Sequence, residues 1–434
     1  MNAAERFNLL REVELSGNCS HPIRLKGEMV NLATGEVGIS SLRISCKDRR
    51  HVICPSCSYT YKADAWILVS TGLVGGKGTP DEVATHPRLF VTLTAPSFGA
   101  VHTVTHRGGC VTNRSAISNP GARGPYCHHH RLRSCDQRHS ARDPHLGRPL
   151  CDECFDYEGA VLWNAHASKL WNNTIQLIRR SLAESGGMGQ RNLSRVAQLH
   201  YLKVAEMQRR GLAHLHIVLR ADGPGSIDAE PPSWLTSELL TRTVRTSVGR
   251  AMAAGADGRM LHWGERLDIQ DLGSTIQDTT KIPSYVAKYA VKTTDGTLEL
   301  ARRFHSRRQI ENLVDDPHAK RLALTSWDLD LRPALASLHL RDHAHNFGFT
   351  GQLITKSRRY STAFGALRQA RADYMVGQNI GDPVGGTFQY EGRGYDDPRG
   401  TELAEMFFVM QRELREERAE ARRALTISEV EDPA

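Results

Sequence analysis

The chain has 434 residues, enough for two or three domains with buried cores. Its 56 Lys and Arg residues against 48 Asp and Glu residues give a formal net charge of +8, which favours a polyanionic partner, most commonly nucleic acid. The sequence has no apolar run of 18 residues and no apolar signal-peptide core in residues 1–30, so we expect a cytoplasmic protein with no membrane partner.

The first half of the chain combines irregular and regular segments. Residues 88–95 are an apolar, β-branched run that predicts a buried strand. Residues 107–155 are rich in Gly, Pro, His, Cys and Arg, which predicts a loop-rich insertion that needs a further constraint to become ordered. Apolar side chains at helical spacing predict a helix over residues 156–184, ended by Gly186 and Gly187.

Two predicted strands follow, at residues 195–207 and 213–220, and the sequence QRRG between them is typical of a hairpin turn. Further elements are expected as a helix at 234–254, a strand at 261–269, a short helix at 284–292 that opens after Pro283, and a charged helix at 401–425.

The sequence His214-Leu215-His216 lies in an apolar predicted strand. Residues i and i+2 of a strand point to the same face, so both imidazoles leave one face together. Glu206 ends the preceding strand and reaches the same face if the two strands are antiparallel neighbours. Two imidazoles and a carboxylate suit Mg²⁺ or Mn²⁺ bound beside a phosphate. The alternatives are ordinary surface or core histidines and an exposed carboxylate.

A second candidate element is YVAKYAVK at residues 285–292. On a helix, Tyr285 and Tyr289 lie one turn apart, about 6 Å along the axis, and Lys288 and Lys292 each lie beside a tyrosine. A phenol with a pKa of about 10 is a weak nucleophile until cationic neighbours and a metal-polarised phosphate assist it. The alternative is an ordinary amphipathic helix with packed tyrosines and solvated lysines.

Three motifs occur in the order FVTLTAP at 90–96, HLHIVL at 214–219 and YVAKYAVK at 285–292. They resemble the motifs of rolling-circle replication initiators of the HUH (His-hydrophobic-His) endonuclease superfamily. The doubled tyrosine and RRGLAHLH resemble the two-tyrosine initiators of isometric single-stranded DNA phages. The segments NCSHPIRLKG, CPSC and TKSRRYSTAFGALR are similar to replication initiators of actinobacterial plasmids and integrative elements. The resemblance covers most of the chain.

The resemblance implies that His214 and His216 bind the catalytic Mg²⁺ or Mn²⁺, with Glu206 as a third ligand. It implies a site-specific endonuclease and ligase that nicks one strand of a plasmid-type origin, exposed as single-stranded or hairpin DNA. A free 3′-hydroxyl then primes rolling-circle synthesis, and a host helicase and DNA polymerase act downstream.

The resemblance also implies roles for the helix at residues 285–292. Tyr289 is the first choice for the attacking nucleophile, which forms a 5′-phosphotyrosine link. Tyr285 makes the second cut, because this chain has a tyrosine where some plasmid relatives have a glutamate that activates water. Lys288 and Lys292 stabilise the phosphate charge. The order in which the two tyrosines act is not readable from the sequence.

The cysteines gather around two C-x-x-C pairs, the spacing of zinc sites. The expected first set is Cys19, Cys46, Cys54 and Cys57. The expected second set is Cys127, Cys135, Cys151 and Cys154, with His128, His129, His130, His139 and His145 as competing ligands. Four protein ligands make a structural Zn²⁺ site, and zinc in the second set would order the insertion. The alternative is scattered reduced cysteines.

A basic segment with two aromatic residues lies nearer the C-terminus; it contains Lys356, Arg358, Arg359, Tyr360, Phe364, Arg368 and Arg371. Lysine and arginine neutralise phosphates, and the aromatic rings are candidates for stacking on unpaired bases. A solvated helix face is the alternative.

We therefore expect an α+β fold: an HUH-endonuclease core with a central antiparallel sheet flanked by helices, zinc-binding modules and a helical C-terminal region. The expected domains are a zinc module at 1–80, a nicking domain at 86–300 with the zinc-binding insertion at 107–155, and a basic, mostly helical region at 301–434. The alternatives are a two-tyrosine transposase and a non-catalytic zinc-dependent DNA-binding regulator. Conjugative relaxases place the tyrosine before the histidines, and the order here argues against them.

Overall fold

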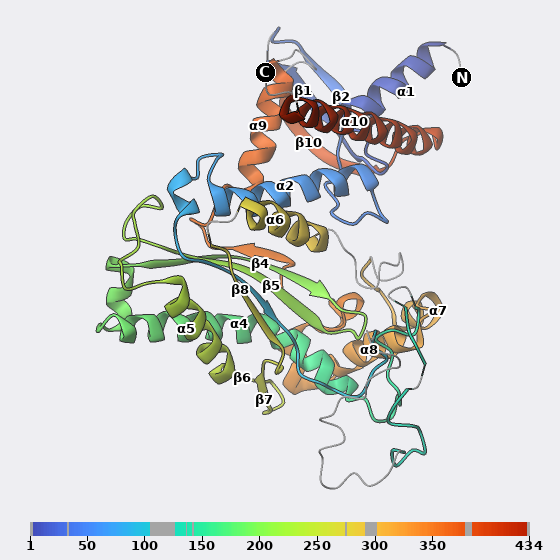
Figure 1. The fold of residues 1–434 in the computed structure, drawn as a ribbon. Coiled ribbons are helices and arrows are strands. Elements are labelled where there is room, and N and C mark those ends of the chain that lie inside the picture. The colour runs from blue at the N-terminus through green and yellow to red at the C-terminus, as the bar shows by residue number, and fades with distance from the viewer. Residues whose placement is uncertain are drawn as a thin grey trace. The chain divides into compact units, whose positions relative to one another are not determined.

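The computed structural model describes residues 3–32, 34–104, 126–135, 137–140, 143–273, 276–290, 302–377 and 384–431. The chain divides into two units, and their helices and strands are drawn in Figure 1. Unit 1 comprises Met1–Asp64 and Ala363–Ala434, and unit 2 comprises Ala65–Thr362. Both units combine helices with antiparallel strands, which confirms the predicted α+β class. Among the residues described, no helix is long and apolar enough to cross a membrane.

Unit 1 brings the two ends of the chain into one sheet with the order β10-β1-β2. Its elements are α1 (Ala3–Leu15), β1 (Ile23–Asn31), β2 (Val37–Ile44), the first half of α2 (Pro55–Val74), α9 (Phe364–Gly377), β10 (Val384–Arg393) and α10 (Arg399–Glu431). Ile23 of β1 lies opposite Arg393 of β10, and α1 packs against α10. These boundaries differ from the three consecutive segments expected from the sequence, because strand pairing over so long a separation has no local signature.

Unit 2 is built on a five-stranded sheet with the order β8-β3-β5-β4-β9, in which all neighbours are antiparallel. The strands are β3 (Arg88–Leu93), β4 (Gln198–Met207), β5 (Ala213–Asp222), β8 (Leu267–Asp271) and β9 (Ile354–Lys356). The strand with the two histidines, β5, is therefore central. The single strand expected at 261–269 is instead two, β8 and the short β7 (Met260–His262), which pairs with β6 (Met252–Ala254).

Helices cover both faces of this sheet (Figure 1). The long α4 (Tyr157–Ser185) and α5 (Ser237–Arg250) lie on one side, and α6 (Ile276–Ala290) lies on the other. Alternate side chains of β5, namely Leu215, Ile217 and Leu219, enter the same core as Leu170 and Ile178 of α4. Each fully buried aliphatic side chain of this kind stabilises the fold by about 2 kcal/mol. That apolar face supplies the packing energy and leaves the opposite face free for polar groups.

Two further helices complete unit 2, α7 (Arg307–Leu313) and α8 (Pro317–Leu329), and α8 packs against α4. The start of α6 corrects a sequence prediction, because Pro283 lies inside the helix and does not open it. Proline lacks a backbone N–H and removes one helical hydrogen bond at this position. The helix nevertheless extends back to Ile276.

The hairpin between β4 and β5 is held by an unusual buried asparagine. The backbone N–H of Gly211 donates to the carbonyl of Gln208 at 2.8 Å, which confirms the predicted turn. Gly211 has φ +76°, and a Cβ there would lie 2.1 Å from Cδ1 of Leu322, so a side chain does not fit. Asn164 of α4 is fully buried, donates to the Gly211 carbonyl at 2.7 Å and accepts from the Ala213 N–H at 2.9 Å.

Replacing Asn164 with alanine is expected to lower the free energy of unfolding by about 3 kcal/mol, because buried backbone groups of the hairpin lose their partners. Denaturant unfolding followed by tryptophan fluorescence measures the change. Asn173→Ala is the matched control, since Asn173 lies on the same helix and donates from an exposed position to the Met252 carbonyl. The control is expected to cost less than about 1 kcal/mol. Equal losses in the two variants would contradict this role for Asn164.

Candidate metal centres and active site

The register of the sheet places three predicted ligands on one face. Glu206 of β4 lies directly opposite His214 of β5, so the antiparallel pairing expected from the sequence is confirmed. The two imidazole centroids are 4.7 Å apart and the rings are nearly perpendicular, at 80°. Oε2 of Glu206 lies 3.4 Å from Nε2 of His216. This face of β4 and β5 therefore gathers two imidazoles and a carboxylate.

His216 is buried and His214 is half-buried. The side chain of His216 is 1% exposed, and Nδ1 of His214 is buried with no hydrogen-bond partner among the residues described. Burial lowers the pKa of His214 to about 4, the neighbouring His216 and Arg210 lower it further, and Glu206 opposes them. His214 is thus neutral at pH 7, the form that binds metal ions. A buried ring nitrogen without a partner is an unsatisfied group that a cation would satisfy.

The set is more open than the cysteine clusters of the same chain. In three other groups all ligand atoms lie within 4.8 Å of one another, and in the described part of the chain the trio of His214, His216 and Glu206 does not form such a group. A cation that is shared with a substrate phosphate needs open positions and few protein ligands. The looser arrangement fits that kind of site better than a closed structural one.

Tyr285 of α6 lies against the histidine face. Its ring makes an edge-to-face contact with His216, with centroids 5.3 Å apart at 85°, and a second one with Phe90 of β3 at 5.9 Å. Phe90 itself stacks on His216 at 5.9 Å. Tyr285 is nevertheless 43% exposed, so a substrate can approach it. Segments from all three sequence motifs thus meet at His216.

Of the other three residues predicted on this helix, the structure describes only Lys288 in full. Lys288 is exposed on α6. Position 289 belongs to α6, but the side chain of Tyr289 lies outside the described residues, as does the whole of Lys292. Helical spacing puts position 289 one turn after position 285 on the same side of the helix.

Two residues beside this site were not assigned a role from the sequence. Arg210, in the β4–β5 turn, is close enough to His214 to lower its pKa. Burial lowers the pKa of Arg210 itself to about 10, so it still carries a positive charge at pH 7. Trp66 of α2 is 38% exposed and its Nε1 donates to Oγ of Ser284 at 3.2 Å, next to Tyr285. The sequence could have indicated Arg210, because it lies in the RRG turn just before the histidine strand. The contact of Trp66 with α6 joins distant segments, so no local sequence pattern predicts it.

The first cysteine set is brought together as predicted. The ligand atoms of Cys19, Cys46, Cys54 and Cys57 lie within 4.8 Å of one another, and all four thiols are free. Sγ of Cys19 is 3.8 Å from that of Cys54 and 3.7 Å from that of Cys57. A tetrahedral zinc with Zn–S bonds of about 2.3 Å separates its sulfurs by about 3.8 Å. These residues fit a structural zinc ion.

The second cluster corrects one predicted ligand. It consists of Cys127, His129, Cys151 and Cys154, and Nδ1 of His129 lies 3.4 Å from Sγ of Cys154. The N–H of His130 donates to the Cys127 carbonyl at 3.0 Å, and this tight turn brings His129 back beside Cys127. Cys135, which was predicted as a ligand here, lies outside the cluster. His129, a competing ligand in the sequence analysis, replaces it.

The basic segment also requires a correction. Tyr360 was expected to stack on bases, but it is fully buried and its hydroxyl donates to the Val69 carbonyl at 3.2 Å. Lys356 is half-buried, and its Nζ donates to the carbonyl of Ser361 at 2.7 Å. Arg358 and Arg359 are exposed and stay candidates for phosphate contacts. Phe364 likewise stacks on Tyr61 with centroids 4.8 Å apart.

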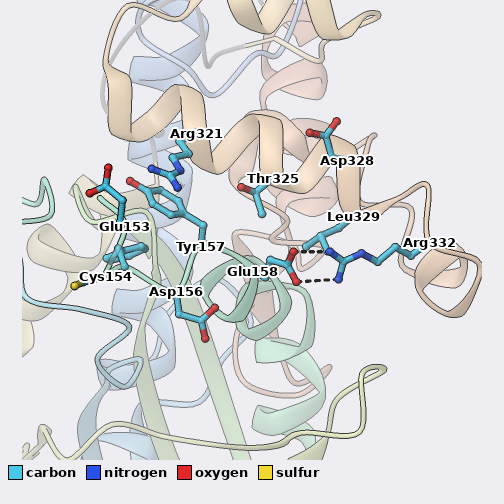
Figure 2. Close-up of a pocket in the computed structure, with 11 residues that line it drawn as sticks. Glu153, Cys154, Asp156, Tyr157, Glu158, Arg321, Thr325, Asp328, Leu329 and Arg332 are labelled. Carbon is cyan, nitrogen blue, oxygen red and sulfur yellow. Dashed lines mark hydrogen bonds and ion pairs between the residues drawn. The ribbon is translucent and has the colours of Figure 1, made fainter. Parts of the chain in front are cut away.

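A pocket of about 530 Å³ is lined by Cys154 and by residues of α4 and α8, and its lining includes none of His214, His216 and Glu206 (Figure 2). Arg332 pairs with Glu158 at its rim, and Arg321 covers the ring of Tyr157 at 4.6 Å. Its lining carboxylates are Glu153, Asp156, Glu158 and Asp328. Four carboxylates against two arginines disfavour a phosphate, so we do not place DNA in this pocket.

Comparison with known proteins identifies the family. The family model described as "Replication initiator protein, pSAM2" matches residues 6–408. The chain belongs to this family. A curated replication initiator protein of Streptomyces ambofaciens is 37% identical over 381 residues, which cover 84% of this chain and 77% of the relative. No solved structure matches. The predicted resemblance to replication initiators of actinobacterial plasmids is thereby confirmed.

Each cysteine cluster of this replication initiator is expected to hold its own zinc ion. Cys54→Ser and Cys151→Ser should each remove one zinc per chain and lower the melting temperature, because a tetrahedral site with three ligands binds weakly. Elemental analysis of the purified variants measures the loss. His128→Gln is the control, since His128 is exposed and outside the cluster. Unchanged zinc in either cysteine variant would rule out that site.

Proposed function

We propose that this replication initiator nicks one strand of DNA at a plasmid-type origin by tyrosine transesterification. The observation that carries the proposal is the contact of Tyr285 with His216, on the sheet face that also holds His214 and Glu206. A partly exposed tyrosine in contact with one of two paired imidazoles suits phosphoryl transfer better than a packing role. The five-stranded antiparallel sheet with the histidines on its central strand supports an HUH-type core, and unit 2 would be the nicking domain.

We propose His214, His216 and Glu206 as the ligands of Mg²⁺ or Mn²⁺. The unpartnered, buried Nδ1 of His214 and the neutral state of its ring fit a cation there. Such an ion, when bound, withdraws charge from the scissile phosphate and makes it a better electrophile. The apolar packing of Leu215 and Ile217 on the other face fixes the strand and so holds both imidazoles in place.

The tyrosines would carry the covalent step. The phenol oxygen attacks phosphorus, the bond from phosphorus to the 3′ oxygen breaks, the phenol loses its proton and the 3′ oxygen gains one. The products are a 5′-phosphotyrosine and a free 3′-hydroxyl that primes synthesis. Tyr289 is proposed for the first cut and Tyr285 for the second, and the exposed Lys288 would contact the phosphate. Because the link preserves a phosphodiester, the reverse reaction rejoins the strand.

The proposed partner is single-stranded or hairpin origin DNA, to which the formal charge of +8 is suited. Arg358 and Arg359 would neutralise phosphates outside the active site. A host helicase and a DNA polymerase would extend the free 3′ end. The match to replication initiators favours this function over a two-tyrosine transposase.

Incubation with single-stranded origin DNA and Mn²⁺ is expected to yield a covalent adduct on a denaturing gel. The label belongs on the 3′ end of the oligonucleotide, because the protein keeps the 5′ phosphate of the downstream fragment. The reaction has two steps, cleavage and strand transfer. The single variants Tyr285→Phe and Tyr289→Phe should each lose one of these steps and keep the other. The double variant should form no adduct.

His216→Ala should reduce adduct formation at least 100-fold, which corresponds to about 2.7 kcal/mol. Tyr374→Phe is the matched control, because Tyr374 is 65% exposed and belongs to α9 of unit 1, whereas the histidine strand belongs to unit 2. It should nick like the wild type. An adduct that persists in the double tyrosine variant would refute the nucleophiles, and a wild type without adduct on any origin oligonucleotide would favour a non-catalytic regulator.

A further inference from the structure

Cys135, displaced from the second cysteine cluster, lies in a third group of metal-binding side chains. Its sulfur and one ring nitrogen each of His102 and His139 lie within 4.8 Å of one another. Nδ1 of His102 is 3.0 Å from Nε2 of His139, and Sγ of Cys135 is 3.4 Å from that same Nε2. His102 precedes the insertion at residues 107–155, Cys135 and His139 lie within it, and none of the three belongs to the other two clusters.

These separations are those of ligands around one ion. With Zn–N bonds of about 2.0 Å and a Zn–S bond of about 2.3 Å, a tetrahedron has N–N edges of about 3.3 Å and N–S edges of about 3.5 Å. Two imidazole nitrogens as close as 3.0 Å form one hydrogen bond at best, whereas a cation satisfies both lone pairs. We propose that His102, Cys135 and His139 bind a zinc ion, with His145 as the fourth ligand.

His145 is the histidine placed to complete the site. Its ring centroid lies 6.2 Å from that of His102 and 6.3 Å from that of His139. Its side chain is 56% exposed, whereas that of His139 is 1% exposed, so His145 closes the site from the solvent side. A modest turn of an exposed side chain brings its free ring nitrogen to the ion.

Asp143 orients two of these ligands. One carboxylate oxygen lies 2.7 Å from Nδ1 of His139 and the other lies 3.0 Å from Nδ1 of His145. Both rings therefore turn Nε2 away from Asp143, and for His139 this is the atom that faces Cys135 and His102. A carboxylate behind a metal-binding histidine fixes its tautomer and makes it a better ligand.

The site joins the insertion to the catalytic hairpin. The N–H of His102 donates to the Arg148 carbonyl at 2.9 Å, so the two ends of the insertion meet here. Arg209, in the turn before β5, donates to the carbonyl of Asp143 at 2.6 Å. Four protein ligands leave no open position, so this zinc has a structural role. It would fix the insertion against the turn that leads into His214.

The test counts zinc and does not depend on nicking. Cys135→Ser and His139→Ala should each lower the zinc content by one per chain, as measured by elemental analysis and native mass spectrometry. His139→Cys should restore it, since a thiolate replaces the imidazole. The double variant Cys127→Ser, Cys135→Ser should lose two zinc ions, because the two residues lie in separate sites. His128→Gln is the matched control from the same insertion and should keep all zinc, since His128 is exposed and belongs to none of the three groups.

Cobalt substitution gives an independent readout. With Co²⁺ in place of zinc, Cys135→Ser should remove the charge-transfer absorbance of one thiolate, and His139→Ala should remove that of the whole site. Unchanged zinc content together with unchanged cobalt spectra in both variants would overturn the proposal. The loss of only one ion in the Cys127→Ser, Cys135→Ser double variant would also overturn it, because that result means a single shared site.

Discussion

The structure depends on the antiparallel register of β4 and β5. This pairing puts Glu206 opposite His214, and the two-residue alternation of β5 puts His216 beside them. A shift of one residue would turn both imidazoles into the apolar core and the leucines toward α6. The register is fixed by the turn at Gly211, where no side chain fits, and by Asn164, which bonds to both sides of that turn. The geometry of the candidate catalytic face is thus set by the hairpin turn that leads into His214.

The two faces of the five-stranded sheet have different roles. Leu215, Ile217 and Leu219 pack with α4 and supply the burial that stabilises unit 2. The opposite face carries polar side chains, and α6 brings Tyr285 onto it. The buried histidines are tolerated because burial keeps His214 neutral, so no uncompensated charge is enclosed. Zinc bound at the proposed sites would hold their ligands together, and Arg209 links Asp143 of the insertion to the hairpin on which the register depends.

Much of the site could be predicted from the sequence, because its signals are local. Strand alternation at His214 and His216, helical spacing at Tyr285 and the C-x-x-C pairs each lie within a few residues. The rest depends on long-range contacts. Tyr360 is buried against Val69, β1 pairs with β10, and the tight turn at residues 127–130 brings His129 beside Cys127. Composition alone cannot distinguish one zinc site from two when cysteines and histidines are interspersed.

The most direct test of the account locates the DNA on the protein. Cleavage at Lys281, Lys288 and Lys292 by trypsin would place Tyr285 in the peptide IPSYVAK and Tyr289 in the peptide YAVK. After nuclease trimming of the covalent adduct, tandem mass spectrometry is expected to find a nucleotide 5′-phosphate on the tyrosine of one of these two peptides, with Tyr289 carrying the first cut. A nucleotide attached to any other peptide would contradict the central claim that the tyrosines of α6 cut DNA beside the histidine strand.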